Sequence, residues 1–197
     1  MAKLYLNKYR NDSARHPTWD YASNAAYFIT VCTKDRICWL GEVVDGIMNL
    51  SPIGELLQSE WYKTPDMRPE MNLKLGAIQV MPNHFHGIVI IGGANDGDNA
   101  GDRDATHCVP IPQFSPSSKR WPNQFGPQSK NLASIIRGIK SSVTTQVRKM
   151  ESDAFSGFAW QSRFHDHIIR DEASYLRISN YIIQNPMNWE KDKLRLL

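Results

Sequence analysis

The segment Met81–Ile91 constrains the fold of this chain more than any other part of the sequence. It carries two histidines one residue apart, His84 and His86, followed by the apolar run Ile88–Ile91. In an extended strand, side chains alternate between the two faces, so both imidazoles point to one face and Phe85 points to the other. The apolar run is typical of a strand buried on both faces. The sequence therefore predicts two convergent imidazoles on an interior strand.

Two interpretations of this histidine pair are open. Convergent imidazoles on a rigid strand suit a divalent metal ion, provided that other residues supply further ligands. Alternatively, the two histidines hydrogen-bond to nearby backbone, which is the better interpretation of an isolated H-x-H. A second pair, His165 and His167, precedes Ile168-Ile169 and competes for the same role, with Asp166 facing away on a strand. We rank this pair second as ligands and expect His167 to lie near the site.

Composition favours a soluble protein of one domain, residues 1–197. A net charge of +3 over 197 residues is mild, so an argument for a nucleic-acid partner must come from where the charge lies. The three cysteines lack the spacing of a metal site, which favours reduced thiols and a cytoplasmic location. There is no signal-peptide pattern and no apolar run long enough to cross a membrane, so no membrane partner is expected.

Patterning along the chain predicts an α+β sandwich with a largely antiparallel sheet. The predicted strands and hairpin are Ala26–Thr33, Ile37–Leu50 with a turn at Asp45-Gly46, Met71–Met81 and the histidine strand, and the helices are Ser51 to Pro65, Lys130–Met150 and Asp171–Asn185. Between residues 92 and 128 the composition becomes rich in Gly, Pro, Ser and Asn. A run of this kind cannot bury enough apolar surface to fold alone, so we interpret it as an insertion within one domain.

The helix predicted over Lys130–Met150 has one apolar stripe and no acidic residue. Positive charge mixed with hydroxyl groups on the other faces suits contacts to phosphates, although a solvated cationic face without a ligand is common. The residues that we predict to contact nucleic acid are Arg137, Lys140 and Arg148 on this helix, with Lys3 and Arg10 in the N-terminal arm.

The last predicted helix places a tyrosine and an asparagine side by side. At about 100° per residue, one apolar arc is formed by Tyr175, Leu176, Ile178, Ile182 and Ile183. Tyr181 falls outside this arc, and Asn185 lies one turn further along the same face. The amide oxygen of Asn185 can supply a third ligand beside His84 and His86, and this donor set suits Mg²⁺ or Mn²⁺. An exposed phenol next to such a cation is a candidate covalent nucleophile.

Several motifs together resemble one protein family. They are Met81-Pro-Asn-His-Phe-His-Gly-Ile-Val-Ile, Ala26–Thr33, Leu40–Gly46, Ser134–Ser141, Trp160-Gln161, His167–Arg170 and Tyr181–Pro186. The first resembles the H-U-H motif of the single-tyrosine HUH endonucleases. The whole set, in this order over nearly the entire chain, is similar to the REP-associated tyrosine transposases, whose pattern keeps His167 but not His165.

This resemblance implies a ferredoxin-like, RRM-like sandwich, with the histidines on a central strand and the tyrosine on a C-terminal helix. It also implies that His84, His86 and Asn185 bind the metal and that Tyr181 is the nucleophile. The implied activity is that of a metal-dependent single-stranded DNA endonuclease and strand transferase. It would act on hairpin-forming palindromic DNA through a 5′-phosphotyrosine intermediate, as a monomer or a homodimer.

Two other functions remain open at this stage. The chain could be a non-catalytic module that binds DNA or RNA hairpins, although the intact set His84, His86, Tyr181 and Asn185 argues against the loss of catalysis. It could also be a metal-dependent phosphodiesterase in which water attacks and the tyrosine plays no part.

Overall fold

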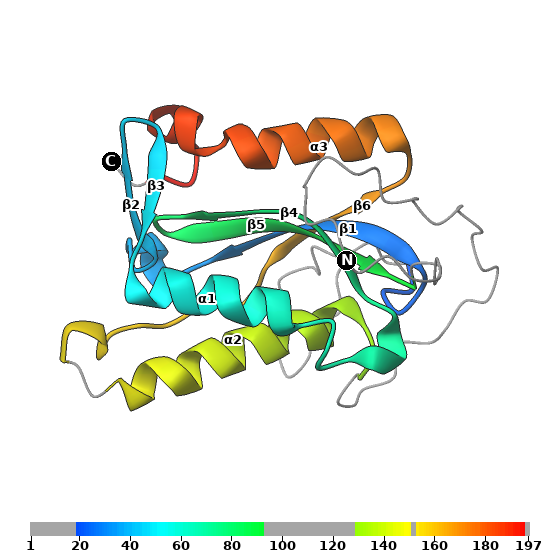
Figure 1. Ribbon diagram of the computed structural model, residues 1–197, viewed down its shortest axis with the longest axis horizontal. Coiled ribbons are helices and arrows are strands. Elements are labelled where there is room, and N and C mark those ends of the chain that lie inside the picture. The colour runs from blue at the N-terminus through cyan, green and yellow to red at the C-terminus, as the bar shows by residue number, and fades with distance from the viewer. Residues whose placement is uncertain (1–18, 93–128, 151–152, 196–197) are drawn as a thin grey trace, which may run out of the picture.

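A four-stranded antiparallel sheet forms the centre of the molecule (Figure 1), whose computed structural model describes residues 19–92, 129–150 and 153–195. The sheet order is β4-β5-β1-β6, formed by Lys74–Met81, His84–Ile91, Ala25–Cys32 and His165–Ile169. Every neighbouring pair is antiparallel. The histidine strand β5 is therefore interior, as the sequence predicted, and all of its residues are buried.

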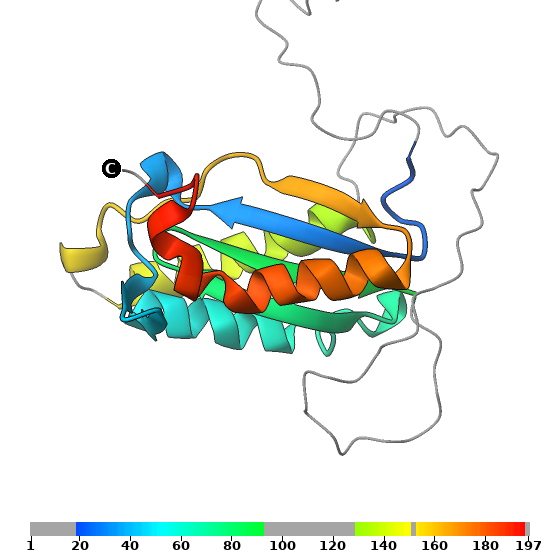
Figure 2. The same cartoon turned by 90° about the horizontal axis from the view of Figure 1, so that it is seen from above.

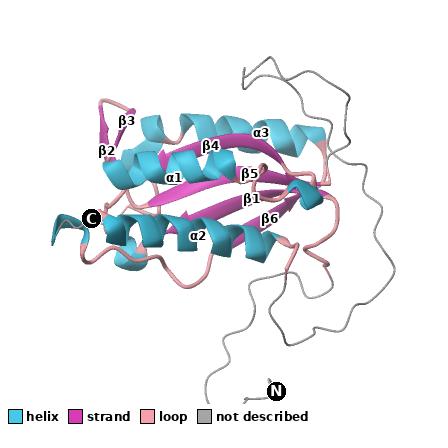
Figure 3. Ribbon diagram, turned by 60° about the horizontal axis from the view of Figure 1, so that its bottom comes forward, coloured by secondary structure: helices cyan, strands magenta, loops and turns pink. Residues whose placement is uncertain are grey.

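The connectivity is ferredoxin-like, as the resemblance implied. Helix α1 (Pro52–Lys63) connects β1 to β4, and helix α2 (Leu132–Lys149) lies between β5 and β6 in the chain. Each β–α–β unit thus contributes two strands with a strand of the other unit between them, which is the split β–α–β arrangement. Both helices cover the same face of the sheet, where they lie side by side (Figure 3).

The sequence sets the start of both helices through capping. Ser51 Oγ accepts a hydrogen bond from Gly54 N at 3.2 Å, and Pro52 occupies the first helical position. At α2, Asn131 Oδ1 accepts from Ser134 N at 2.9 Å while Ser134 Oγ accepts from Asn131 N at 3.1 Å. This reciprocal pair is a capping box, and it satisfies two backbone donors that the helix itself leaves unpaired.

A glycine next to the second histidine lets α1 pack closely on β5. A Cβ atom built at Gly87 would lie 2.5 Å from Trp61 Cη2, which is closer than packed atoms approach. Trp61 is fully buried and also contacts Phe85 edge-on, with ring centroids 5.9 Å apart. This packing fixes β5 from the face opposite to the imidazoles.

Helix α3 (Glu172–Gln184) covers the other face of the sheet, which gives the sandwich its third layer (Figure 1). Asp171 caps it, with Oδ1 accepting from Ser174 N at 2.7 Å. The predicted apolar arc is wrong in part, because Leu176 and Ile183 are 46% and 52% exposed. Helix α3 meets the sheet mainly over β4, along a narrow stripe that includes Tyr175 and Ile182, so the flanks of the arc have no layer to pack against.

The predicted hairpin is present but starts later than expected. Strands β2 (Gly41–Val44) and β3 (Ile47–Leu50) form a separate two-stranded sheet, and a 3₁₀ helix, Lys34–Arg36, precedes them. The predicted insertion lies outside the described residues from position 93 onward, and the organisation of residues 1–197 as one domain stays a prediction. None of the described helices combines the length and apolar character that a membrane span requires.

Candidate functional site

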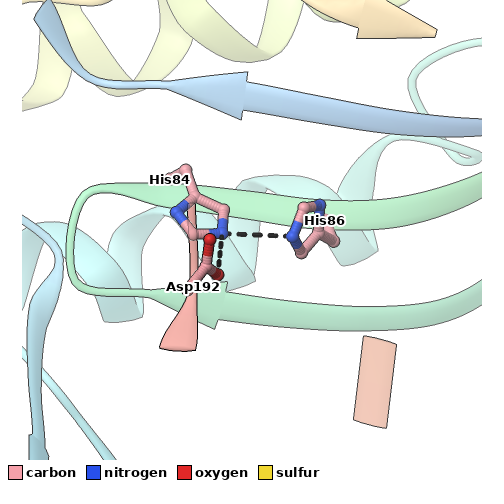
Figure 4. A group of neighbouring side chains, drawn as sticks. All are labelled: His84, His86 and Asp192. Atoms are coloured by element: carbon pink, nitrogen blue, oxygen red, sulfur yellow. Dashed lines mark hydrogen bonds and ion pairs between the residues drawn. The ribbon is translucent and has the colours of Figure 1, made fainter. Parts of the chain in front are cut away.

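The side chains of the two histidines of β5 point toward one another (Figure 4). Their Nε2 atoms are 3.1 Å apart, and both side chains are almost completely buried. Two nitrogen ligands bound at ~2.1 Å and at a right angle lie roughly 3.0 Å apart, so the observed spacing fits a shared cation. The fold therefore brings the pair together as the strand pattern predicted.

The tautomer of His84 follows from its neighbours. Asn83 Nδ2 donates to the Leu194 carbonyl at 2.8 Å, so the amide oxygen Asn83 Oδ1 faces His84 Nδ1, 2.7 Å away. Because an amide oxygen can only accept, His84 Nδ1 carries the proton, and Nε2 presents a lone pair to the site. A partner that fixes the ring through its second nitrogen is the usual arrangement for a metal-binding histidine.

His86 is held in a similar way from the neighbouring strand. Its Nδ1 lies 2.8 Å from Thr30 Oγ1, a buried hydroxyl on β1. When that hydroxyl accepts, His86 Nε2 also presents a lone pair, and two lone pairs at 3.1 Å require a cation between them. When the hydroxyl donates instead, His86 Nε2 carries the proton and donates to His84 Nε2, so the metal-binding interpretation depends on the first arrangement and on the further oxygen ligands described below.

Burial keeps both imidazoles neutral. It lowers the pKa of His84 to about 3, with a further contribution from the charge of Arg36, and it lowers the pKa of His86 to about 3, with a further contribution from the repulsion that two protonated imidazoles would exert on each other. A neutral imidazole is the form that binds a metal ion.

A candidate third ligand is a residue that the sequence did not single out. Asp192 follows the 3₁₀ helix Pro186–Lys191, and its Oδ2 lies 3.7 Å from His84 Nε2. The ligand atoms of His84, His86 and Asp192 all lie within 4.8 Å of one another, and this is the only such group of His, Cys, Asp or Glu among the residues that the structure describes. Since His84 is neutral, its contact with the carboxylate is not an ion pair.

Main-chain hydrogen bonds hold Asp192 in place. Its Oδ1 accepts from Leu194 N at 2.7 Å, and Arg36 donates to the Lys193 carbonyl at 3.2 Å. Together with the bond from Asn83 to Leu194, these contacts fix the segment 192–194 against the turn that precedes β5. Asp192 Oδ2 is buried without a hydrogen-bond partner, which is the condition expected of an oxygen reserved for a cation.

Asn185 and Tyr181 lie where the helical pattern predicted. Asn185 is the C-terminal cap of α3, and its Oδ1 is also buried without a hydrogen-bond partner. Tyr181 is 50% exposed, and its hydroxyl oxygen lies 3.5 Å from His86 Nε2. Burial raises the pKa of Tyr181, as does the charge of Asp192, whereas a hydrogen bond from Asn185 lowers it. The phenol is therefore protonated until a cation or a base assists it.

The other predicted residues lie away from this centre. Arg137 and Arg148 are exposed on α2, which covers the opposite face of the sheet from Tyr181. Lys140 donates to the carbonyls of Gln161 and Arg163, at 2.7 and 3.3 Å, so it also secures the segment that leads into β6. Their contact with nucleic acid stays a prediction, and Lys3 and Arg10 lie outside the described residues.

The rival pair does form a strand, as expected. His165 and His167 are both exposed on β6, on the same face of the sheet as His86. Within the described part of the chain, no third ligand of the His, Cys, Asp or Glu type joins them. The first pair is therefore the better candidate for a metal centre, and His167 lies two strands away from it.

The burial of His84 and His86 predicts that acid destabilises the metal-free protein. Each imidazole titrates near 6.5 in the unfolded chain and near 3 in the folded one, so between these pH values the unfolded state binds more protons. Stability is then fully present above about pH 6.5 and falls as the pH is lowered towards 3, by roughly 2 kcal/mol per imidazole at pH 5.

Urea denaturation in EDTA at several pH values measures this loss. The double variant His84→Gln/His86→Gln serves as the control, because it should show a clearly weaker dependence over the same range. An equal dependence in the two proteins would assign the acid sensitivity to other groups.

Comparison with solved structures places the fold in a known class. A REP-associated tyrosine transposase, whose structure was determined bound to a REP hairpin, aligns with a TM-score of 0.51 and 19% identity over 95% of this chain and 76% of that one. The resemblance found in the sequence is thus confirmed at the level of the fold.

A relative found by sequence has a higher identity to this chain than that transposase has. An uncharacterized protein of Haemophilus influenzae is 33% identical over 183 residues, which cover 92% of this chain and 91% of that protein. The chain belongs to the same family as this Haemophilus protein. No established family model matches it.

Proposed function

We propose that this protein is a metal-dependent endonuclease and strand transferase for single-stranded DNA, related to the REP-associated tyrosine transposases. The observation that carries the proposal is the position of Tyr181, whose hydroxyl oxygen lies 3.5 Å from His86 Nε2 although the two residues are 95 positions apart. A half-exposed phenol next to a buried cluster of metal-binding groups is the arrangement expected of a covalent nucleophile.

Mg²⁺ or Mn²⁺ is the cation that we propose, because the carboxylate of Asp192 and the amide of Asn185 are oxygen donors. His84, His86 and Asp192 would hold it, with the amide oxygen of Asn185 as a further ligand. When bound, such an ion acts as a Lewis acid on a phosphate oxygen and offsets the charge that develops there.

The remaining chemistry falls to the chain itself. Tyr181 Oη attacks the scissile phosphorus, the bond from phosphorus to the 3′-oxygen breaks, and the 5′-phosphate stays on the tyrosine. The phenol proton leaves through the exposed side of the ring, and the departing 3′-oxygen takes up a proton from solvent. The hydrogen bond from Asn185 favours the phenolate. A second 3′-hydroxyl can reverse the step, because one phosphodiester is exchanged for another without oxidation or an external energy source.

The DNA partner is proposed from the same relationship. The structure of the aligned transposase shows that protein bound to a REP hairpin. We therefore expect this chain to act on a single strand beside a hairpin-forming palindrome, with the exposed cations Arg137 and Arg148 as predicted backbone contacts.

Single-stranded oligonucleotides from the genomic flanks of the gene, labelled at the 3′ end that stays with the tyrosine-bound fragment, test the proposal with Mg²⁺ or Mn²⁺ and analysis on denaturing gels. We expect a labelled band shifted by the mass of the protein, and its loss in EDTA. Cleavage without a shifted band would favour the phosphodiesterase that uses water. Hairpin binding without either would favour the non-catalytic module.

A further inference from the structure

The face of the sheet that carries the histidines is only half covered by α3. Helix α3 lies over β4 and β5, whereas β1 and β6 extend beyond it on the same face (Figure 2). Four side chains from these two strands point to this uncovered side, in two cross-strand pairs: Phe28 opposite His167 and Thr30 opposite His165. We call these four residues the β1–β6 strip.

The strip is continuous with the candidate site. Phe28 stacks on His86, with ring centroids 5.3 Å apart, and meets Tyr181 edge-on at 6.2 Å. Thr30 is the residue that holds His86 Nδ1, at 2.8 Å. A nucleic-acid strand that reaches the hydroxyl of Tyr181 must therefore approach over the part of the sheet that α3 does not cover. The β1–β6 strip forms the surface of that part.

The side chains of the strip suit nucleotides. Both imidazoles are exposed and Phe28 is partly exposed, so flat rings are available for stacking on bases. Imidazole nitrogens can also hydrogen-bond to phosphate oxygens. No acidic side chain lies on this face of β1 and β6 within the described residues, because Asp166 points to the opposite face. Arg163 and Arg170 flank β6 at its two ends and are exposed.

The alternative to nucleotide binding is that the two exposed histidines form a second metal centre. On this face, however, no further His, Cys, Asp or Glu of the described chain joins them to make a third ligand. The phenyl ring of Phe28 beside them has no donor atom for a metal ion, whereas it extends a surface on which bases can stack.

We propose that the β1–β6 strip is the docking surface for the single-stranded nucleotides next to the scissile phosphate, with His167 stacking on a base and His165 positioning the backbone. This inference rests on the proposed function, since it identifies where that function's substrate lies. Both histidines are positioning residues: they hold the strand so that its phosphate meets Tyr181, and they make no bond in the reaction.

Binding of a fluorescein-labelled oligothymidylate tests the strip, because stacking tolerates any base. In the Tyr181→Phe background with Mg²⁺ present, the double variant His165→Ala/His167→Ala should raise the dissociation constant by roughly tenfold. His167→Phe, which restores a flat ring, should recover much of the affinity lost in His167→Ala. Tyr62→Ala removes an exposed ring from α1 on the opposite side of the sheet and should leave binding unchanged.

Histidine ring resonances in NMR spectra supply a second readout that a merely structural role would not move. Adding the oligothymidylate should shift the signals of His165 and His167, assigned with the single Gln variants. Unchanged signals, or equal affinity in the double variant, would overturn the strip as the docking surface while leaving the proposed function intact. Strip binding without any Tyr181 adduct in the wild-type protein would instead refute the proposed function alone. No binding by the Tyr181→Phe protein would overturn the strip.

Discussion

Replacing Tyr181 by phenylalanine is expected to abolish the covalent protein–DNA adduct while leaving hairpin binding within about twofold. The substitution removes only the hydroxyl group that lies 3.5 Å from His86 Nε2. The ring remains, with its contacts to Phe28 and to His86, whose centroids lie 6.2 and 5.4 Å away. Cleavage should fall by at least about 10³-fold, which is the scale of losing a nucleophile.

The matched control for this variant is Tyr62→Phe. Tyr62 is 57% exposed, close to the 50% of Tyr181, but lies on α1 across the sheet. Removing the Tyr62 hydroxyl should not change the intensity of the band of the covalent adduct. An adduct that formed at the wild-type level in Tyr181→Phe would show that another residue is the nucleophile.

The second large effect concerns the metal ligands. His84→Ala should lower the affinity for Mn²⁺ by at least about 100-fold and remove metal-dependent cleavage, because it deletes a ligand from a buried and prearranged group. Asp192→Asn should lower the affinity by about 10-fold to 100-fold, since the amide keeps the hydrogen bond from Leu194 N but loses the charge. Isothermal titration calorimetry of each variant measures these changes without relying on activity.

Asp66→Asn is the control for the carboxylate, because Asp66 is exposed on the loop after α1 and should not affect the affinity. Wild-type Mn²⁺ affinity in His84→Ala would show that the metal ion binds at a different site. The exposed pair His165 and His167 would then be the first alternative to examine. Wild-type affinity in Asp192→Asn would leave Asn185 as the third ligand.

Periodicity explains which parts of the fold the sequence could predict. The run from His84 to Ile91 has the composition of a strand buried on both faces, and only an interior strand fits it. The stripe on α2 and the caps Ser51 and Asn131 are local signals, so they predicted the helices to within a few residues. The helical period predicted that Tyr181 and Asn185 share one face of α3, whereas their pairing with the histidines came from donor chemistry and from the family resemblance.

Asp192 shows what local patterns cannot supply. It lies in the charged run Glu190–Lys193, where nothing distinguishes one carboxylate from another. Only the 3₁₀ helix after α3, with Trp189 buried near His84, returns the chain to the turn before β5. A ligand brought in by such a long-range contact has no signature in sequence spacing.

The contacts of the outer helix faces were even harder to predict from the sequence. The cations of α2 were grouped by the absence of acidic residues, which says nothing about the layer on which the helix packs. Likewise, Leu176 and Ile183 belong to an apolar arc by spacing, but α3 meets the sheet only along a stripe over β4 and β5, so these two side chains stay exposed. Both cases depend on the position of whole elements, which is decided by the arrangement of the sheet rather than by the helix sequence.

The most direct test of the central claim is mass spectrometry of the adduct. After reaction with a suicide oligonucleotide, trypsin should release the peptide Ile178–Lys191, which contains Tyr181 as its only tyrosine. We predict that this peptide carries the mass of the 5′-phosphorylated cleavage product, attached through Tyr181. An unmodified Ile178–Lys191 peptide together with cleaved DNA, or the nucleotide mass on any other peptide, would contradict the account.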